Sequence, residues 1–368
     1  MSRPRVLWVG RTRYALPLSP ALARKWGALA AELDLRVLGT SAGGGRGDET
    51  FVLVPPPPVA AGAAFWLALP FRVARLLRSF RPDAVVTQSP YEAAAVLLAR
   101  RLAGPSARLV VDVQGDWRTA TRLYGSPLRG LLSPVADAVA AAALRRADAV
   151  RTITPYTSRL VRALGIEPAA EFPTFVDLDR FTEREPVEPP ERPTALFVGV
   201  LEPYKNVDGL ADAWRLVVSR LPDARLHLVG QGSREEVVRA LLAEHGESVR
   251  WTPRLDTAGV ATALDEATLL VLPSRSEGMG RVVIEAFCRA RPVVGTRVGG
   301  IADLVEDGVN GALVEPGSTE ALADELVRLL GDPERARRLG GAARAGVEPW
   351  LQTAEEFARR TRALVEGS

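Results

Sequence analysis

The stretch TLLVLPSRSEGMGRVVIEAF, residues 268–287, predicts a buried strand, a short loop and a helix in immediate succession. TLLVLP is apolar on both faces, as a strand inside a parallel sheet is. After the loop, Val282, Val283, Ala286 and Phe287 recur at helical spacing and form one apolar stripe. The two glycines of the loop let a ligand approach the backbone, and the N–H groups at the helix start favour an anion such as phosphate.

Two carboxylates stand eight positions apart in this stretch. Glu277 precedes the predicted helix, and Glu285 lies about two turns into it on the same face as Arg281. They are too far apart along the chain to act as a dyad that shares one proton, but each can accept hydrogen bonds from hydroxyls. The spacing suits a ligand with hydroxyls at both ends and a phosphate in the middle, which is the shape of a nucleotide sugar.

The same alternation of strand and helix runs through the second half of the chain. Amphipathic helical patterns at 207–221 and 234–246 separate short apolar runs of strand length, which lie at 194–200, 225–230, 268–273, 292–296 and 311–316. Such an order predicts a parallel sheet covered by helices on both faces. We therefore expect a doubly wound α/β domain over residues 194–345, followed by a C-terminal helix within 346–368.

The first half predicts a second sheet of the same kind. Its strand-like runs are RVLWVG, LDLRVLG, DAVVTQS, ARLVVDVQG and DAVRTIT. Helical stretches rich in alanine and arginine separate them. Residues 1–182 therefore form the other predicted Rossmann-like domain. The segment EREPVEPPERP at 183–193 has four prolines, cannot continue a helix or a central strand, and is predicted to be a linker. Two such domains facing across a cleft would place a ligand between the carboxyl ends of their strands.

Composition excludes several classes of protein. The 368 residues are 47% apolar and 25% charged, which is typical of a globular protein. A single cysteine, Cys288, excludes an internal disulfide and fits a reducing compartment. The N-terminus lacks the pattern of a secretion signal, and the longest uncharged apolar stretch, at 59–71, is too short to cross a bilayer. We expect a cytoplasmic protein.

Charge differs between the two halves. Residues 1–181 hold 24 Lys and Arg against 14 Asp and Glu, whereas residues 182–368 hold 23 against 30. The basic half predicts an anionic partner, either a phosphorylated acceptor or a lipid surface. Nucleic acid is disfavoured because this half lacks aromatics interleaved along a recognisable nucleic-acid module.

In these motifs the chain resembles the retaining glycosyltransferases of GT-B fold of the family four type, whose signature is E-x7-E. LFVGVLEPYKNVDGLADAW at 196–214 is similar to the family's V-G-R-L-x-x-x-K segment, and VGQG at 229–232 to its G-x-G turn. Further family segments are similar to two other stretches of this chain, EAFCRARPVVGTRVGGIADLVEDGVNGALVEPG and FPTFVDLDRF. The resemblance is strong over residues 170–345 and weaker in the first half.

The resemblance implies roles for single residues. Glu277 would hold hydroxyls of the donor sugar and Glu285 those of the ribose. The backbone of Gly278, Met279, Gly280 and Arg281 would surround the sugar and diphosphate, and Lys205 would neutralise the leaving diphosphate. Because fixed cations and helix N–H groups supply this charge and the sequence has no Asp-x-Asp metal motif, we expect neither a metal nor a cofactor beside the donor.

Two positions depart from the family pattern. Val200 stands where the family has an arginine beside the diphosphate, and we expect Arg281 to supply that charge. Gln114 stands where the family places a histidine near the reacting carbon, and Asp116 is the second candidate there. An amide cannot act as a base, but in the retaining mechanism the leaving phosphate takes the acceptor's proton, so a hydrogen-bonding amide is sufficient.

The acceptor side is predicted from two basic segments. The loop after the first strand offers Arg11, Arg13 and Tyr14 as acceptor contacts, although it lacks the family's glycine pair. Residues 63–82 form an amphipathic basic pattern that fits either packing on the sheet or peripheral contact with an anionic membrane surface.

Other functions remain open at this point. A nucleotide-sugar-binding scaffold protein with a degenerate catalytic site would explain Val200 and Gln114, and it would bind donor without hydrolysing it. A sugar epimerase or a phosphorylase on the same fold would need a catalytic acid pair or a pyridoxal lysine segment, and we identify neither in the sequence.

Overall fold

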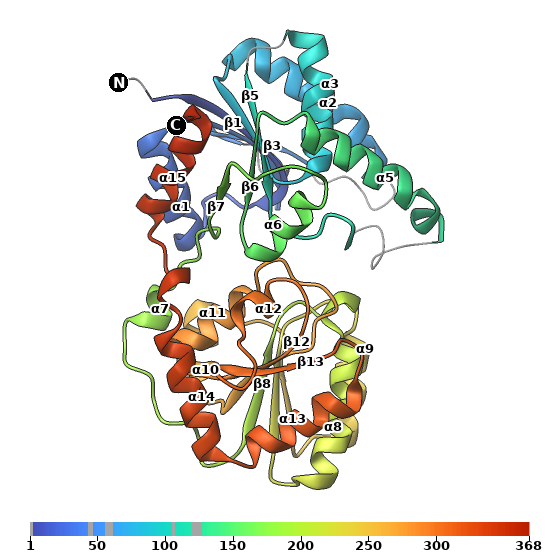
Figure 1. Cartoon of the computed structure of the whole chain (residues 1–368), viewed down its shortest axis with the longest axis vertical. Coiled ribbons are helices and arrows are strands. Elements are labelled where there is room, and N and C mark those ends of the chain that lie inside the picture. Colours follow the sequence, from blue (N-terminus) through green and yellow to red (C-terminus); the bar gives the residue numbers. More distant parts are fainter. Residues whose placement is uncertain (1–2, 43–46, 56–61, 105–106, 120–126, 368) are drawn as a thin grey trace. The chain divides into compact units, whose positions relative to one another are not determined.

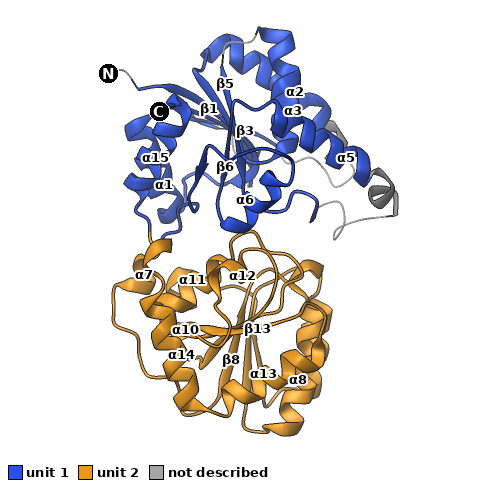
Figure 2. Cartoon of the chain, viewed as in Figure 1, with its two compact units in different colours: residues 1–177, 352–368 blue, residues 178–351 orange. Residues whose placement is uncertain are grey.

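The chain folds into two compact units. The computed structural model describes residues 3–42, 47–55, 62–104, 107–119 and 127–367. One unit comprises residues 1–177 and 352–368, and the other comprises residues 178–351 (Figure 2). The C-terminal helix α15 (Ala354–Glu366) thus belongs to the first unit, and the proline-rich segment 183–193 belongs to the second.

The first unit is built on a seven-stranded parallel sheet of order β3-β2-β1-β4-β5-β6-β7 (Figure 1). Its strands are β1 (Arg5–Tyr14), β2 (Asp34–Ser41), β3 (Phe51–Val54), β4 (Ala84–Thr87), β5 (Arg108–Val113), β6 (Ala149–Thr152) and β7 (Ala170–Glu171). Besides α15, its helices are α1 (Pro20–Glu32), α2 (Gly62–Phe80), α3 (Pro90–Ala103), α5 (Pro127–Arg145) and α6 (Pro155–Arg162). The five predicted strands are present, and the short edge strands β3 and β7 were not predicted.

Helices cover both faces of this sheet because successive strand residues point to opposite sides. Leu7 and Val9 of β1 join a core with side chains of α2, α3 and α5. Val6 and Trp8 of the same strand join a second core with side chains of α1 and α15. The last helix therefore completes the first sheet's second core.

The second unit has a six-stranded parallel sheet of order β10-β9-β8-β11-β12-β13. The strands are β8 (Thr194–Val198), β9 (Arg225–Val229), β10 (Val249–Thr252), β11 (Leu269–Leu272), β12 (Val293–Thr296) and β13 (Gly311–Val314). The helices are α7 (Asp179–Thr182), α8 (Val207–Arg220), α9 (Glu235–His245), α10 (Thr257–Asp265), α11 (Arg281–Cys288), α12 (Ile301–Leu304), α13 (Thr319–Leu330) and α14 (Pro333–Ala345), with 3-10 turns η2 (Pro203–Lys205) and η3 (Glu348–Trp350). The doubly wound prediction is confirmed, and only β10 was not foreseen.

Two buried arginines fasten the proline-rich segment to the second unit. Arg289 donates to the carbonyl oxygens of Arg184 and Glu185 at 2.6 and 3.0 Å, and it also pairs with Asp265 at 2.7 Å. Arg291 donates to the carbonyl oxygen of Val187 at 2.9 Å. Because proline has no backbone N–H, this segment cannot pair its carbonyl groups within a helix or a sheet. The guanidinium groups of the two arginines, which follow α11, supply the donors instead.

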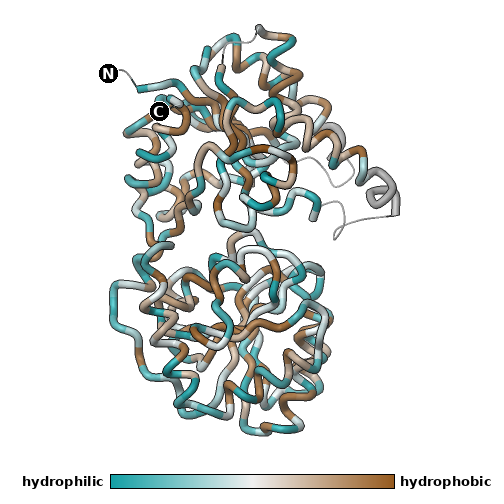
Figure 3. Tube along the Cα trace, viewed as in Figure 1, coloured by the Kyte–Doolittle hydropathy of each residue, from teal (hydrophilic) through white to brown (hydrophobic). Residues whose placement is uncertain are grey.

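Apolar residues gather in the central strands of both units, as the hydropathy colouring shows (Figure 3). Among the described helices, none combines the length and the hydropathy needed to span a bilayer.

We predict that His227 makes the second unit sensitive to acid. Burial, with a smaller contribution from the charge of Arg250, lowers the pKa of His227 to about 4, and its Nε2 lies 2.9 Å from the Thr252 hydroxyl. An unfolded chain holds this histidine near a pKa of about 6.5, so it binds more protons than the folded state between those values. The stability that the neutral ring contributes is complete above about pH 6.5 and is lost as the pH falls towards 4.

The measurement is the melting temperature of wild type and His227→Gln at pH 7.5 and pH 5. The decrease on acidification should be smaller in the variant. Equal decreases in both proteins would contradict the assignment.

Candidate active site

The second sheet brings Lys205 and Glu277 together at its topological switch point. β8 and β11 are neighbours in the sheet, and the chain leaves them in opposite directions, which opens a crevice beyond their carboxyl ends. Lys205 ends the turn η2 after β8, and Glu277 lies in the loop between β11 and α11. Their side chains form a largely buried ion pair between positions 72 residues apart in the chain.

Glycines hold the Glu277 loop against the loop that follows β12. Gly299 has a φ of +52°, and a Cβ there would overlap the carbonyl oxygen of Glu277. A Cβ on Gly300 would overlap the carbonyl oxygen of Gly278, and the Gly300 N–H donates to the carbonyl oxygen of Glu277 at 3.0 Å. The close backbone contact fixes the position of Glu277, and only glycine allows it.

A second pair of glycines does the same for the loop after β8. A Cβ on Gly230 would overlap the carbonyl oxygen of Gly199, and one on Gly232 would lie within 2.5 Å of the carbonyl oxygen of Leu201. The Leu201 N–H donates to the carbonyl oxygen of Gln231 at 3.0 Å. The G-x-G turn after β9 therefore supports the segment that carries Lys205.

The loop and helix after β11 have the predicted form. Gly280 caps α11 with a φ of +74°, a left-handed conformation that favours glycine. Met279 is buried, and Arg281 is exposed at the first position of the helix. Burial raises the pKa of the Glu285 carboxyl, and the charge of Arg281 opposes that shift. The positive charge of Arg281 thus acts on the Glu285 carboxyl from one turn earlier in α11.

Val200 is exposed and leaves its position without a charge. Arg281 is predicted to supply the charge that Val200 lacks. It is the first residue of α11, directly after the loop that holds Glu277, and the same helix carries Glu285. The compensation by Arg281 stays a prediction.

In the first unit, Gln114 and Asp116 follow β5 and have different partners. The Nε2 of Gln114 donates to the carboxylate of Asp112 at 2.8 Å. Asp116 accepts two hydrogen bonds from the guanidinium of Arg118, at 2.8 and 3.0 Å, and lies 3.4 Å from the Tyr156 hydroxyl. Both side chains thus have a partner of opposite polarity, and the role of each towards a ligand stays a prediction.

The three predicted acceptor contacts separate in the structure. Arg11 and Arg13 are exposed, and the Arg11 guanidinium lies over the rings of Phe65 and Trp66 at 5.6 and 5.4 Å. Tyr14 is only 3% exposed and packs against core aromatics, with its ring centroid 5.1 Å from that of Phe51. The prediction for Tyr14 is therefore corrected: β1 extends through this segment, and after a register shift between Val9 and Arg13 its last residue, Tyr14, faces the core.

Three polar residues near these loops were missed in the sequence. Asp112 and Arg151 form a buried pair beneath Gln114. Glu92 is buried at the start of α3, where its carboxylate contacts the Ser89 hydroxyl, and burial raises its pKa to about 7. The signals were a charged residue inside each apolar strand, and the S-x-x-E pattern of a capping box at 89–92.

No group of three or more histidine, cysteine, aspartate or glutamate side chains suited to a metal ion occurs among the residues that the structure describes.

Two Rossmann-like units, each with a parallel sheet in doubly wound order, define the GT-B class of fold. Sucrose-phosphate synthase from Thermosynechococcus elongatus shares it, with a TM-score of 0.79, 20% sequence identity and coverage of 99% of both chains. Residues 10–172 match the family described as Glycosyl transferase 4-like domain, and residues 192–332 match Glycosyl transferases group 1.

Sequence relatives agree with these matches. The GDP-mannose-dependent monoacylated alpha-(1-6)-phosphatidylinositol monomannoside mannosyltransferase of Corynebacterium glutamicum is 31% identical over 220 residues, which are 55% of this chain and 58% of the relative. The GDP-mannose-dependent alpha-(1-6)-phosphatidylinositol monomannoside mannosyltransferase of Mycolicibacterium smegmatis is 32% identical over 66% of this chain and 68% of the relative. The alignment thus spans little more than half of the corynebacterial protein. The chain belongs to the GT-B glycosyltransferases of the family four type.

We predict that Gly299→Ala destabilises the second unit. The added methyl would displace the backbone of Glu277, with a cost of about 1–3 kcal/mol from overpacking and about 1–2 kcal/mol from the left-handed backbone. Gly341→Ala is the matched control: it lies within α14 with open space around it, so it should be neutral or stabilising by up to about 1 kcal/mol. Thermal unfolding of both variants checks this, and equal melting temperatures would refute the close contact.

Proposed function

We propose that this protein is a retaining glycosyltransferase that moves a sugar from a nucleotide diphosphate sugar to an anionic acceptor. The observation that carries the proposal is the Lys205–Glu277 ion pair at the switch point of the second sheet, beside a glycine-bounded loop and the start of α11. A cation, a carboxylate and backbone N–H groups then converge where a doubly wound domain binds its ligand.

Each group matches one part of such a donor. Glu277 accepts hydrogen bonds from sugar hydroxyls and Glu285 from ribose hydroxyls. Lys205, Arg281 and the backbone of residues 278–281 meet the negative charge of the diphosphate. This charge grows as the sugar leaves, so groups fixed there lower the barrier without a metal ion. We accordingly expect EDTA to leave the activity unchanged.

The transfer breaks the bond between the anomeric carbon and the diphosphate oxygen, whose electron pair leaves with the diphosphate. The acceptor oxygen forms its bond to the same face of the sugar, and its proton passes to a phosphate oxygen. Configuration is retained, and the protein needs no basic side chain at Gln114. This route is consistent with an amide at that position.

The basic first unit is proposed to hold the acceptor, with Arg11 and Arg13 as its contacts. Two relatives are named for transfer to a phosphatidylinositol mannoside, and this motivates the proposal that the acceptor here also carries an anionic or lipid-linked group. The charge excess of residues 1–181 favours such a partner.

One face of α2 suits contact with an anionic membrane surface. Leu67 and Phe71 are 74% and 66% exposed, and Arg75 and Arg78 continue the same helical face, exposed as well. Exposed apolar side chains beside arginines fit the interface of a bilayer that carries negative charge. We propose that the first unit docks there to reach its acceptor.

The alternative is a nucleotide-sugar-binding scaffold protein with lost turnover, which Val200 and Gln114 favour. It would bind donor but release no sugar from it, even slowly.

The donor site predicts a specific pattern of thermal stabilisation. UDP-, GDP-, ADP- and dTDP-sugars are tested on wild type, Glu285→Ala and Arg281→Ala. At a hundredfold excess over Kd, one nucleotide family should stabilise wild type by about 2.7 kcal/mol, or about 5–10 °C for a domain of this size. Both variants should lose most of this shift.

Stabilisation with slow donor hydrolysis supports the transferase, and stabilisation without hydrolysis supports the scaffold. No response to any donor would sink both. An unchanged shift in Arg281→Ala would refute its compensation for Val200.

Membrane contact predicts that Leu67→Ser/Phe71→Ser sediments less with vesicles of phosphatidylglycerol and phosphatidylcholine. The loss of two apolar anchors should weaken binding about tenfold or more. Val309→Ser/Leu351→Ser, which changes two exposed apolar residues of the second unit, is the control and should bind as wild type does. Wild-type sedimentation that does not depend on anionic lipid would dispose of the proposal.

A further inference from the structure

A hollow of about 440 Å³ lies in the first unit between the last helix of the chain and the edge of the sheet. One wall is α15 with its C-cap, whose lining residues recur at helical spacing at positions 360, 363, 364 and 367. The opposite wall is the stretch 169–172 around the edge strand β7, together with Arg108 from the start of β5. All of these residues belong to one compact unit, and the hollow has the size of a site for a small organic ligand.

Arg108 forms one end of the hollow. Its guanidinium lies against Gly367, where an added Cβ would be 2.8 Å from the Nη1 of Arg108. The Nε of Arg108 is buried and has no hydrogen-bond partner among the residues that the structure describes. Asp148, whose charge Arg108 also meets, already pairs with Arg100 at 2.8 Å. Because a buried N–H group without a partner is costly, this end of the hollow calls for an acceptor.

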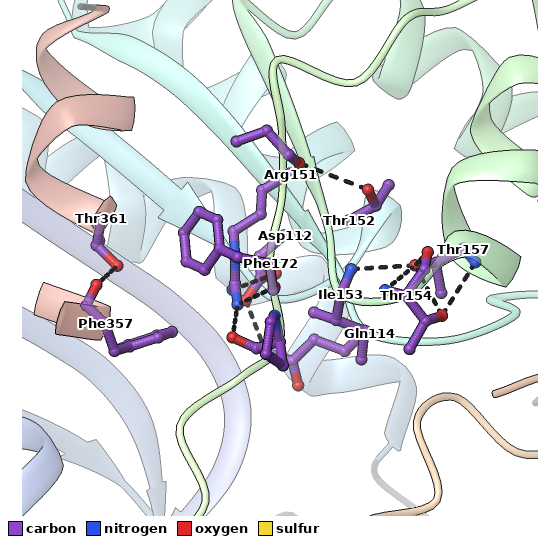
Figure 4. A network of polar contacts seen from close by, with 12 residues as sticks. Asp112, Gln114, Arg151, Thr152, Ile153, Thr154, Thr157, Phe172, Phe357 and Thr361 are labelled. Carbon is purple, nitrogen blue, oxygen red and sulfur yellow. Dashed lines mark hydrogen bonds and ion pairs between the residues drawn. The ribbon is translucent and has the colours of Figure 1, made fainter. Parts of the chain in front are cut away.

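Arg360 forms the other end of the hollow. Its Nη1 donates to the Oε1 of Gln352 at 3.3 Å, and its guanidinium lies 4.7 Å from the ring centroid of Phe172. The guanidinium of Arg151 lies 4.0 Å from the same centroid (Figure 4). Burial lowers the pKa of Arg151, Asp112 opposes that shift, and the charge of Arg360 adds to it. Arg360 thus repels a second cation while its own two partners, an amide and an aromatic ring, are neutral.

The two guanidinium groups at the ends are too far apart for one small anion. Arg360 and the helix position next to Arg108 are about two turns apart, or about 10 Å along α15. The side chain of Arg360 also extends towards Gln352 at the helix start, away from Arg108. Between them the hollow is lined by Leu364, which is buried, and by Ala363, which is half-buried. A cation at each end and an apolar wall between them suit an elongated ligand with two acidic groups.

We propose that this hollow binds an organic dicarboxylate, with one carboxylate on Arg108, the other on Arg360, and the hydrocarbon chain along the apolar wall. A guanidinium can bind a carboxylate through two parallel hydrogen bonds. Two carboxylates balance the two arginines, whereas two phosphates would bring a surplus of negative charge next to Glu171, which lines the same hollow. The site lies apart from the proposed donor site and does not depend on it.

The experiment measures the melting temperature of the whole protein at rising concentrations of suberate, succinate or octanoate, with sodium chloride holding the ionic strength constant. Suberate has a carboxylate at each end of a long chain. Succinate is too short to reach both arginines, and octanoate has the same chain length as suberate but only one carboxylate. Suberate should stabilise wild type at concentrations about tenfold or more below those of the other two.

Three outcomes of this series would overturn the inference. Equal effects of suberate and octanoate would contradict recognition at both ends. No stabilisation by any of the three would contradict the site itself. Stronger stabilisation by an alkane bisphosphate of the same length would contradict the preference for carboxylates.

Variants locate the binding. Arg108→Gln and Arg360→Gln should each weaken the effect of suberate about tenfold or more, because each removes one charged partner. Ala363→Leu keeps both arginines but fills the middle of the hollow, and it should also remove the effect. Arg359→Gln changes the neighbouring exposed arginine of α15, which does not line the hollow, and as the matched control it should respond as wild type does.

Arg360 is exposed, so its variant keeps the test decisive even if Arg108→Gln or Ala363→Leu folds poorly, which melting temperatures without ligand report. An unchanged effect of suberate in Arg360→Gln would overturn the inference. An equal loss in Arg359→Gln and Arg360→Gln would do the same, because it would indicate binding to surface charge in general.

Discussion

The ion pair between Lys205 and Glu277 is the interaction on which the second unit's site depends. Its partners come from loops that follow two neighbouring strands, and the two loops reach each other only because the strand order reverses there. Each loop is held by glycines whose neighbours leave no room for a Cβ: Gly232 supports the lysine side, and Gly299 supports the glutamate side. Backbone packing thus sets the positions from which both side chains form their ion pair.

The first unit uses charge in another way. Its sheet carries a buried aspartate and a buried arginine side by side, and aromatic rings from a loop and from the last helix enclose the guanidinium. The result is an oriented amide at Gln114 rather than an exposed charge.

Much of this was readable from the sequence because it depends on local patterns. The strand, loop and helix around Glu277 follow from an apolar run, two glycines and a helical stripe. The edge strands β3, β7 and β10 were missed because they are short and carry little pattern of their own. Tyr14 was misread because the first strand continues through a segment that looks like a loop. The hold of Arg289 and Arg291 on the proline-rich segment, and the Asp112–Arg151 pair, depend on contacts between distant positions that a single sequence does not reveal.

The most direct measurement is amide hydrogen exchange of the whole protein, followed by mass spectrometry, with and without the nucleotide diphosphate that stabilises it most. Protection should increase in residues 199–206, 274–285 and 298–301, the loops at the carboxyl ends of β8, β11 and β12. The second unit also has a hollow of about 320 Å³ at the opposite ends of its strands, lined by Arg192, His227 and Glu247 among others. Protection confined to residues 192–194 and 246–250 around that hollow, with the three loops unchanged, would contradict a donor site at Glu277.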